Sequence, residues 1–202
     1  MIDVSPKPLM GRRGLVLGIA NEHSLAYGCA LGFRTLGADL AITYLDEKAK
    51  PYVEPLAKEL EAPIFLPCDV MVPGQLDAVF DEMERTWGKI DFALHAIAFA
   101  PKEDLHGRLC DCSRDGFLLA MDVSCHSFIR MARLAEPLMR DGVPGMAERT
   151  TGTHYFDWHH TEADTFDKVN LDDFRKNLAA MAVMGYVLAD MPGRLVSARR
   201  GQ

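Results

Sequence analysis

The chain has 202 residues, of which 49% are hydrophobic and 25% are charged, a balance typical of a globular domain that buries a core. Its formal net charge of -7 disfavours a nucleic acid or an anionic membrane surface as a partner. No stretch approaches the roughly 18 unbroken apolar residues of a membrane span, and the first residues show no signal-peptide pattern. These features predict a cytoplasmic protein whose partner is a small molecule or another protein.

The five cysteines are an odd number and are scattered, which predicts reduced thiols rather than a disulfide framework. Cys110 and Cys112 form a Cys-x-Cys pair, but two further ligands at metal-site spacing are missing. We therefore assign no metal site to this pair.

The first 140 residues alternate between strand and helix patterns. Residues 14–20 are a nearly continuous apolar run, typical of a strand that is covered on both faces. Residues 21–24 can turn the chain and cap a helix, and Gly37 can end that helix. The same patterns predict, in chain order, strands at residues 39–44, 63–68 and 90–97 and helices at residues 46–61, 74–87 and 113–139.

Four strand-helix units of this length predict an α/β fold with a doubly wound parallel sheet of strand order 3-2-1-4. Pro51 and Pro55 should shorten or kink the second helix. The fourth strand, at residues 90–97, is expected to be an exposed sheet edge unless the C-terminal residues cover it.

A phosphate-binding site is predicted at the carboxyl ends of the strands. In such a sheet the ligand binds beyond the carboxyl ends of the strands, at the switch between strands one and four. Gly18 lets the backbone approach a pyrophosphate, and the helix that begins near Ser24 directs its free N–H groups to the same place. Residues 68–70 and 96–100 lie at the ends of strands three and four. The strict Gly-x-Gly-x-x-Gly pattern is absent, so spacing indicates no more than a general nucleotide site.

Four motifs occur in the order seen in one known family: residues 18–28 (GIANEHSLAYG), 68–70 (CDV), 95–100 (HAIAFA) and 122–128 (DVSCHSF). Over about residues 8–141 the chain closely resembles the bacterial NADH-dependent enoyl-acyl-carrier-protein reductases, which are divergent short-chain dehydrogenases of fatty-acid biosynthesis. The resemblance implies a Rossmann fold, NAD as the cofactor and an acyl-carrier-protein thioester as the partner.

The resemblance also implies a set of site residues. They are Gly18, Ser24 and Leu25 at the pyrophosphate, Asp69 and Val70 at the adenine, Ile97 beside the ribose and the nicotinamide, and Ala100 at the acyl substrate. His95 and His126 match no catalytic position of the family, and we interpret each of them as a packed or a surface histidine.

The catalytic Tyr-x6-Lys pair of that family has no match in this sequence. The seventh residue after Tyr155 is Glu162, and the seventh after Tyr186 is Gly193. Tyr155 and Lys168 are thirteen positions apart. No catalytic residue is therefore assigned, and the expectation is an incomplete family member that binds NAD but is catalytically impaired.

Residues 142–202 differ in character from what precedes them. Loop-like residues lead to a helix that Asn170 can cap, with an amphipathic pattern of apolar side chains. Residues 142–192 resemble the C-terminus of a two-zinc aminopeptidase and carboxypeptidase family, which implies a zinc-ligand position at His160. A peptidase needs further ligands upstream, where this chain resembles the reductase, so no metal is assigned. The sequence predicts a chimera with parts 1–141 and 142–202.

Two alternative functions remain open from the sequence. One is a fragment of a zinc-dependent aminopeptidase or carboxypeptidase, suggested by the C-terminal residues. The other is a non-catalytic nucleotide-binding or interaction module. Such a module would associate, for example as a homo-oligomer, through the helix at residues 113–139 or through the edge of strand four.

Overall fold

The computed structural model describes residues 7–139 and, near the C-terminus, residues 170–173, 175–176, 179–180 and 183. The chain separates into two compact units, Met1–Gly142 and Val143–Gln202. The first unit contains the sheet and is described first.

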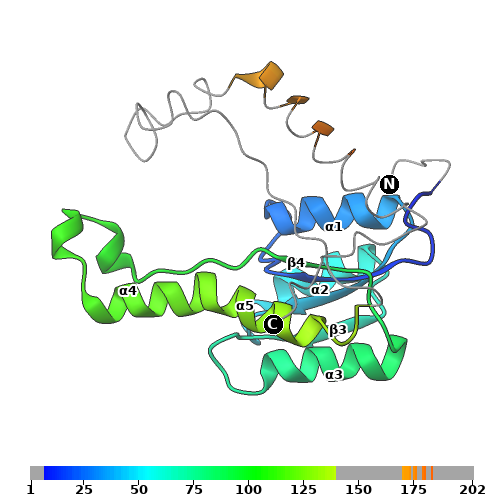
Figure 1. The fold of residues 1–202 in the computed structure, drawn as a ribbon, viewed down its shortest axis with the longest axis horizontal. Helices are drawn as coiled ribbons and strands as arrows, with labels where there is room; N and C mark the ends of the chain where they lie inside the picture. Colours follow the sequence, from blue (N-terminus) through cyan, green and yellow to red (C-terminus); the bar gives the residue numbers. More distant parts are fainter. Residues whose placement is uncertain (1–6, 140–169, 174, 177–178, 181–182, 184–202) are drawn as a thin grey trace, which may run out of the picture. The chain divides into compact units, whose positions relative to one another are not determined.

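A parallel sheet forms the centre of the first unit, with its four strands in the order β3-β2-β1-β4 (Figure 1). This confirms the doubly wound fold class and the strand order expected from the sequence. The strands are β1 (Arg13–Leu17), β2 (Asp39–Tyr44), β3 (Ile64–Pro67) and β4 (Phe92–His95).

Helices connect the strands and cover both faces of the sheet (Figure 1). Three of them complete the first three strand-helix units: α1 (Leu25–Thr35), α2 (Lys50–Glu59) and α3 (Gln75–Trp87). After β4 come two short 3-10 turns, η1 (Lys102–Leu105) and η2 (Leu109–Asp111), and then α4 (Arg114–Met121), the π-helical segment η3 (Asp122–His126) and α5 (Ser127–Ala135).

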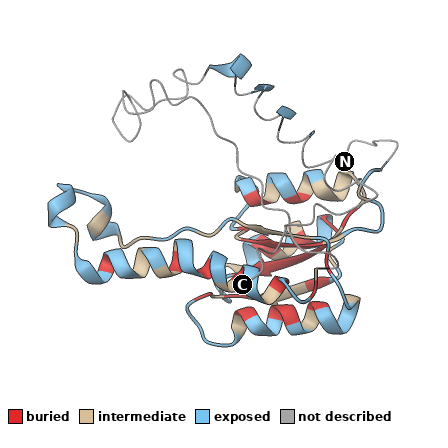
Figure 2. Cartoon of the chain, in the orientation of Figure 1, coloured by how far each residue is buried: buried red, intermediate tan, exposed pale blue. Residues whose placement is uncertain are grey.

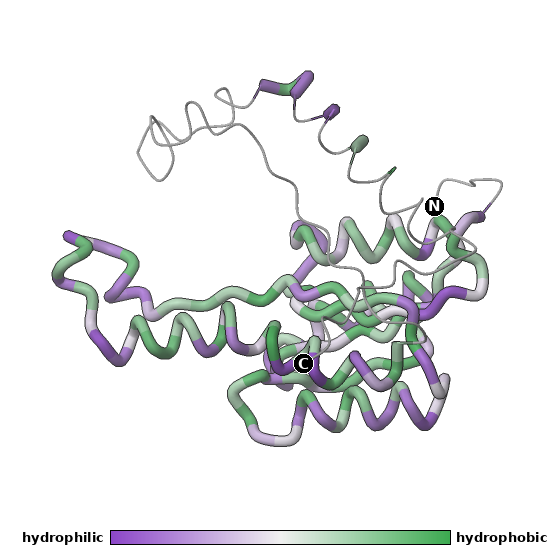
Figure 3. Tube along the Cα trace, viewed as in Figure 1, coloured by the Kyte–Doolittle hydropathy of each residue, from purple (hydrophilic) through white to green (hydrophobic). Residues whose placement is uncertain are grey.

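Two hydrophobic clusters hold the helices to the sheet, one on each face (Figures 2 and 3). Successive side chains of a strand point to opposite faces, so β1 contributes to both clusters. Leu15 and Leu17 join the cluster that includes buried residues of α3 and α5, whereas Val16 joins the cluster that includes residues of α1 and α2. The central strands are buried on both sides, as the continuous apolar run of residues 14–20 indicates.

The predicted helix at residues 113–139 is not one continuous α-helix. It is interrupted at η3, where the Ser127 N–H donates to the Asp122 carbonyl instead of to the carbonyl one residue later. The Ser127 hydroxyl also donates to the Val123 carbonyl, at 2.6 Å. These bonds widen one turn into a π-helical segment, and α5 ends at Ala135 rather than near residue 139.

The second helix also differs from the predicted range of residues 46–61. It begins at Lys50, with Pro51 in its first turn and Pro55 within it. Asp46 precedes the helix and forms a turn in which its Oδ1 accepts from the N–H groups of Lys48 and Ala49, at 2.9 and 2.8 Å. The helix is therefore shortened at its start, as the two prolines predict.

Strand β4 lies at the outer edge of the described sheet, as expected, but the chain returns to it. The Ile90 N–H donates to the Leu138 carbonyl at 3.1 Å, and Ile90 forms a parallel bridge with Met139. Ile90, just before β4, therefore has backbone partners at Leu138 and Met139.

The described residues of the second unit support the predicted helix start. Asn170 Oδ1 accepts from the N–H groups of Asp172 and Asp173, both at 3.1 Å, and residues 171–173 are helical. The cap at Asn170 is thus confirmed. Other predictions for this part lie outside the described residues, namely those for Tyr155, His160, Lys168 and most of the amphipathic pattern.

Candidate nucleotide site

The carboxyl ends of the four strands all lie along the same side of the sheet, and the candidate residues lie at these ends. Leu17 at the end of β1 pairs with His95 at the end of β4, and the Ala96 N–H donates to the Leu17 carbonyl at 3.1 Å. On the other side, the Cys68 N–H donates to the Tyr44 carbonyl at the end of β2, at 2.7 Å. Parallel register therefore places the chain segments that follow all four strands along the same edge (Figure 1).

Gly18 closes the turn after β1 onto the segment that follows β4. Its φ is +101°, a conformation that side chains other than glycine rarely adopt. A Cβ built at this position would lie 2.2 Å from the Ala96 carbonyl oxygen. Only glycine fits here, so the two candidate segments, at Gly18 and at residues 96–100, meet through backbone alone.

The N-terminus of α1 faces the same edge. Ser24 occupies the predicted N-cap position with extended backbone angles, but its side chain does not cap the helix. Its hydroxyl donates back to the Asn21 carbonyl at 2.5 Å, which tightens the turn instead. Leu25, the next candidate, is 88% exposed. The first N–H groups of α1 are thus not capped by the Ser24 side chain, and the helix dipole favours an anion there.

The segment after β3 carries Asp69 and Val70. Asp69 is half-buried; its Oδ1 accepts from the Met71 N–H at 2.8 Å, and its own N–H donates to Gln75 Oε1 at 2.7 Å. Val70 is 3% exposed and packs in a hydrophobic cluster of the core. A ligand can therefore meet the Asp69 carboxylate, whereas the Val70 side chain mainly fixes this segment to the core.

Cys68 precedes Asp69 and is buried. Burial raises the pKa of the Cys68 thiol to about 11, and the charge of the Asp69 carboxylate acts in the same direction. The positive charge of Arg130 opposes the rise. At neutral pH this thiol is protonated, and it serves as a small apolar side chain beneath the site.

Cys68 is expected to react with iodoacetamide at pH 8 at least 100-fold more slowly than the exposed Cys29, because the thiolate is the nucleophile and burial both suppresses it and blocks access. Timed alkylation followed by peptide mass spectrometry measures both rates. Unfolding the chain in urea is the control, since the two rates should then converge. Equal rates in the folded chain would contradict the burial of Cys68.

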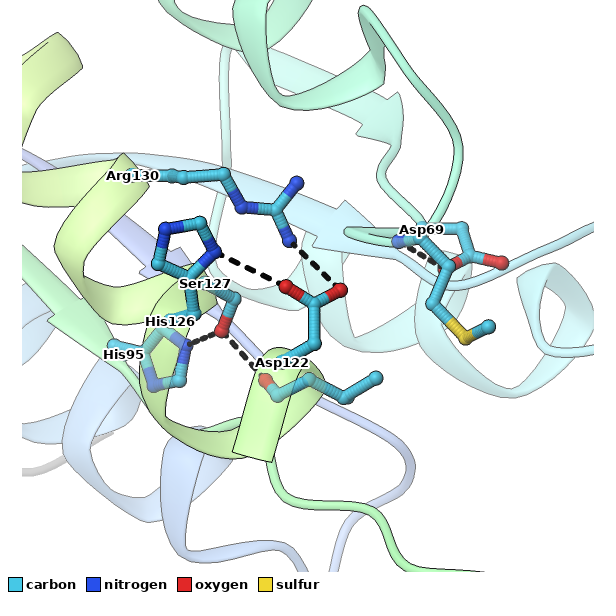
Figure 4. Close-up of polar contacts among 8 residues, drawn as sticks. Asp69, His95, Asp122, His126, Ser127 and Arg130 are labelled. Atoms are coloured by element: carbon cyan, nitrogen blue, oxygen red, sulfur yellow. Dashed lines mark hydrogen bonds and ion pairs between the residues drawn. The ribbon is translucent and has the colours of Figure 1, made fainter. Parts of the chain in front are cut away.

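The two histidines differ in their surroundings, since His95 is packed and His126 lies at the surface (Figure 4). His95 is partly buried and its Nε2 lies 2.7 Å from Ser127 Oγ. Because the Ser127 hydroxyl donates to a carbonyl, His95 Nε2 is the donor to Ser127. Burial lowers the pKa of His95, which favours the neutral ring. His126 is exposed, with its Nδ1 3.0 Å from Asp122 Oδ1.

Sequence reasoning missed the polar contacts that η3 and α5 make with the end of β4 and with the segment after it. Ser127 reaches His95 from 32 positions away, and Ser124 reaches Phe99 from 25 positions away. Arg130 Nη2 lies 3.8 Å from Asp122 Oδ2 (Figure 4). The motif at residues 122–128 is the sequence signal for this region, but the motif alone indicates no role for its serines.

Ile97 and Ala100 are both half-buried in the irregular segment after β4. Gly18 follows β1 and Ile97 follows β4, which are neighbouring strands. Asp69 follows β3, which lies two strands away from β1, with β2 between them. This arrangement is extended along the edge, which suits a ligand with several groups in a row.

A family model described as enoyl-(acyl carrier protein) reductase matches residues 18–182. Among curated proteins, the chain is 46% identical over 132 residues to an enoyl-[acyl-carrier-protein] reductase [NADH] of Rhizobium meliloti, covering 65% of this chain and 49% of the relative. It is 41% identical over 131 residues to the corresponding enzyme of Aquifex aeolicus, covering 65% of this chain and 48% of the relative.

Solved structures agree with the sequence relatives. The reductase of Anaplasma phagocytophilum in complex with NAD matches with a TM-score of 0.63 and 42% identity, covering 65% of this chain and 50% of that one. The reductase of Aquifex aeolicus matches with a TM-score of 0.64 and 41% identity, covering 67% of this chain and 53% of that one.

The chain spans about half the length of the curated relatives it matches. These comparisons do not support the second resemblance, to a two-zinc peptidase, and the family model continues past residue 142 to residue 182. On its matched residues and its fold, the chain belongs to the enoyl-(acyl carrier protein) reductase family.

Proposed function

We propose that this chain is a member of the NADH-dependent enoyl-acyl-carrier-protein reductases of fatty-acid biosynthesis that binds NAD along the carboxyl edge of its sheet. The observation that carries the proposal is the turn at Gly18, which closes onto the Ala96 carbonyl beside the N-terminus of α1. Such a turn lets backbone N–H groups approach a pyrophosphate without a side chain in the way. The relative from Anaplasma phagocytophilum has the same fold and is in complex with NAD.

The residue roles are those that the family resemblance implies, and the places of these residues at the carboxyl ends of the strands support them. Gly18, Ser24 and Leu25 would hold the pyrophosphate at the start of α1. Two segments away, the half-buried Asp69 carboxylate would accept from the adenine amine, while Val70 holds that segment to the core. Ile97 would lie beside the ribose and nicotinamide, and Ala100 would line the acyl site.

We propose that this chain lacks the residues that stabilise the enolate and donate its proton. NADH supplies a hydride when bound, and the enolate that forms then needs a donor such as a tyrosine hydroxyl. The sequence has no Tyr-x6-Lys pair, and loss of such donors lowers rates by about 10² to 10³ or more. We therefore propose that the chain binds the cofactor but is catalytically impaired, with an acyl-carrier-protein thioester as the partner of the family reaction.

Two measurements on the purified chain test this function. Isothermal titration is expected to show NADH binding with a Kd below millimolar, and binding no tighter than millimolar would remove the cofactor proposal. An assay with NADH and a crotonyl thioester should show no turnover above the rate without protein. Measurable turnover would disprove the catalytic part and leave the cofactor part standing.

The domain division and the partners belong to the same proposal. We propose residues 1–141 as the NAD-binding part and residues 142–202 as a distinct C-terminal part, in a cytoplasmic protein. No helix among the residues described is long and apolar enough to cross a membrane. A homo-oligomer is supported by exposed apolar side chains along α4 and α5, namely Phe117, Leu118, Met121, Phe128 and Ile129.

The alternatives are distinguished by simple measurements. Near two zinc ions per chain, in protein purified without a histidine tag, would favour the peptidase interpretation of residues 142–192. Within the described residues no cluster of three metal-ligating side chains occurs, and His160 lies outside them. For the interaction module, a monomer in size-exclusion chromatography with light scattering would argue against self-association.

A further inference from the structure

The Ser124 hydroxyl forms hydrogen bonds with both backbone polar groups of Phe99, the N–H and the carbonyl. The Phe99 N–H donates to Ser124 Oγ at 3.0 Å, and the Ser124 hydroxyl donates to the Phe99 carbonyl at 3.1 Å. One hydroxyl can do both because it carries one donor and two acceptor lone pairs. The Phe99 side chain is 49% exposed, so its burial does not hold this part of the chain.

This contact matters because residues 96–100 have no regular secondary structure. Beyond β4 the ladder with β1 ends at the bond from Ala96 to Leu17, so the following backbone groups need other partners. Ser124 supplies partners at Phe99, while Ser127 holds His95 at the last residue of β4, at 2.7 Å. The stretch that contains Ile97 is thus fixed at both ends by serines of a single helical region.

Ser124 lies in an irregular turn of the helical region that follows β4. Ser124 lies in η3, whose π-helical bond runs from the Ser127 N–H to the Asp122 carbonyl. Single π-helical turns within α-helices are rare and are often found at functional sites. Ser127 itself is completely buried, and its contact with His95 of β4 attaches this turn to the sheet.

We propose that Ser124 is a positioning residue, whose hydroxyl fixes residues 97–100 as the wall for the nicotinamide half of the cofactor. The ligand part rests on the proposed NAD site. Ser124 touches Phe99 rather than the reacting atoms, and Ile97 and Ala100, on either side, are the wall residues. Removing the hydroxyl should loosen this wall and leave the adenine and pyrophosphate positions at Asp69 and Gly18 intact.

The test compares two ligands on the full chain. NADH carries the nicotinamide, and ADP-ribose lacks it. In isothermal titration, Ser124→Ala is expected to weaken NADH binding about tenfold, the equivalent of two modest hydrogen bonds, with ADP-ribose binding changed less than about twofold. Ser124→Thr keeps the hydroxyl and should restore NADH binding. Cys125→Ala, at the exposed neighbouring position of η3, is the matched control and should bind both ligands as the unaltered chain does.

Hydrogen exchange of the Phe99 amide provides a readout that needs no ligand. Ser124→Ala should speed its exchange about tenfold or more, while amides of β1 and β2 keep their rates. Unchanged NADH affinity and unchanged exchange in Ser124→Ala would overturn the proposal, as would an equal loss of NADH and ADP-ribose binding. If the unaltered chain does not bind NADH, the proposed function fails, and the exchange rates still decide whether Ser124 fixes this segment.

Discussion

Replacing Gly18 by alanine is expected to lower the free energy of unfolding by about 2–4 kcal/mol and to abolish NADH binding. The left-handed backbone at φ +101° costs a residue with a Cβ about 1–2 kcal/mol. The added Cβ would also lie 2.2 Å from the Ala96 carbonyl oxygen, which is backbone and cannot rotate away. Urea denaturation followed by circular dichroism measures the first effect, and titration with NADH measures the second.

Gly32→Ala is the matched control for this substitution. Gly32 lies within α1, where an added Cβ would meet nothing within 4 Å. Alanine there should raise the free energy of unfolding by about 0.5–1 kcal/mol, because it is the better helix former. An unfolding free energy of Gly18→Ala that matches the unaltered chain would contradict the close approach of β1 and β4 at this turn.

Replacing Leu40 by alanine is expected to lower the free energy of unfolding by about 3–4 kcal/mol. Leu40 lies in β2 with 0% exposure, in the cluster between the sheet and the helices α1 and α2. Truncation removes buried apolar surface and leaves a cavity that helices on a rigid sheet cannot close completely. The midpoint of urea denaturation should fall while the slope is unchanged.

Leu109→Ala makes the same chemical change at an exposed position. Leu109 is 93% exposed in η2, so its truncation should change the free energy of unfolding by less than about 0.5 kcal/mol. A comparable loss for both leucines would show that the sheet core of β2 is not packed as described. NADH binding of Leu40→Ala, measured well below its unfolding midpoint, should remain, because Leu40 lies inside the sheet, away from its carboxyl edge.

The order of the sheet could be predicted because it follows from local patterns and one chiral rule. Short apolar runs at residues 14–20 and 39–44, each followed by a helical pattern, indicate buried parallel strands. Right-handed crossovers then restrict the strand order to very few possibilities. The side-chain spacing of residues 113–139 predicts a continuous helix, because it does not reveal the bond from the Ser127 N–H to the Asp122 carbonyl.

The candidate site divides in the same way. Its position at the ends of the strands follows from the parallel sheet, and Gly18 and Asp69 could be named from the sequence because they directly follow strands. The burial of the Val70 side chain and the contact of Ser124 with Phe99 could not be named. These depend on which distant segments pack together, and the two partners of the Ser124 contact are 25 positions apart.

By itself, the sequence determined the alternation of strands and helices, the edge at which a nucleotide would bind and the glycine that such a turn needs, because short-range sterics and hydrophobic periodicity govern all three. Only the tertiary structure decided how closely Gly18 approaches Ala96, that the helix after β4 contains a π-helical turn, and that its serines hold the segment after β4. The physical reason is that hydrogen bonds between segments far apart in the chain form only after the sheet has brought them within reach.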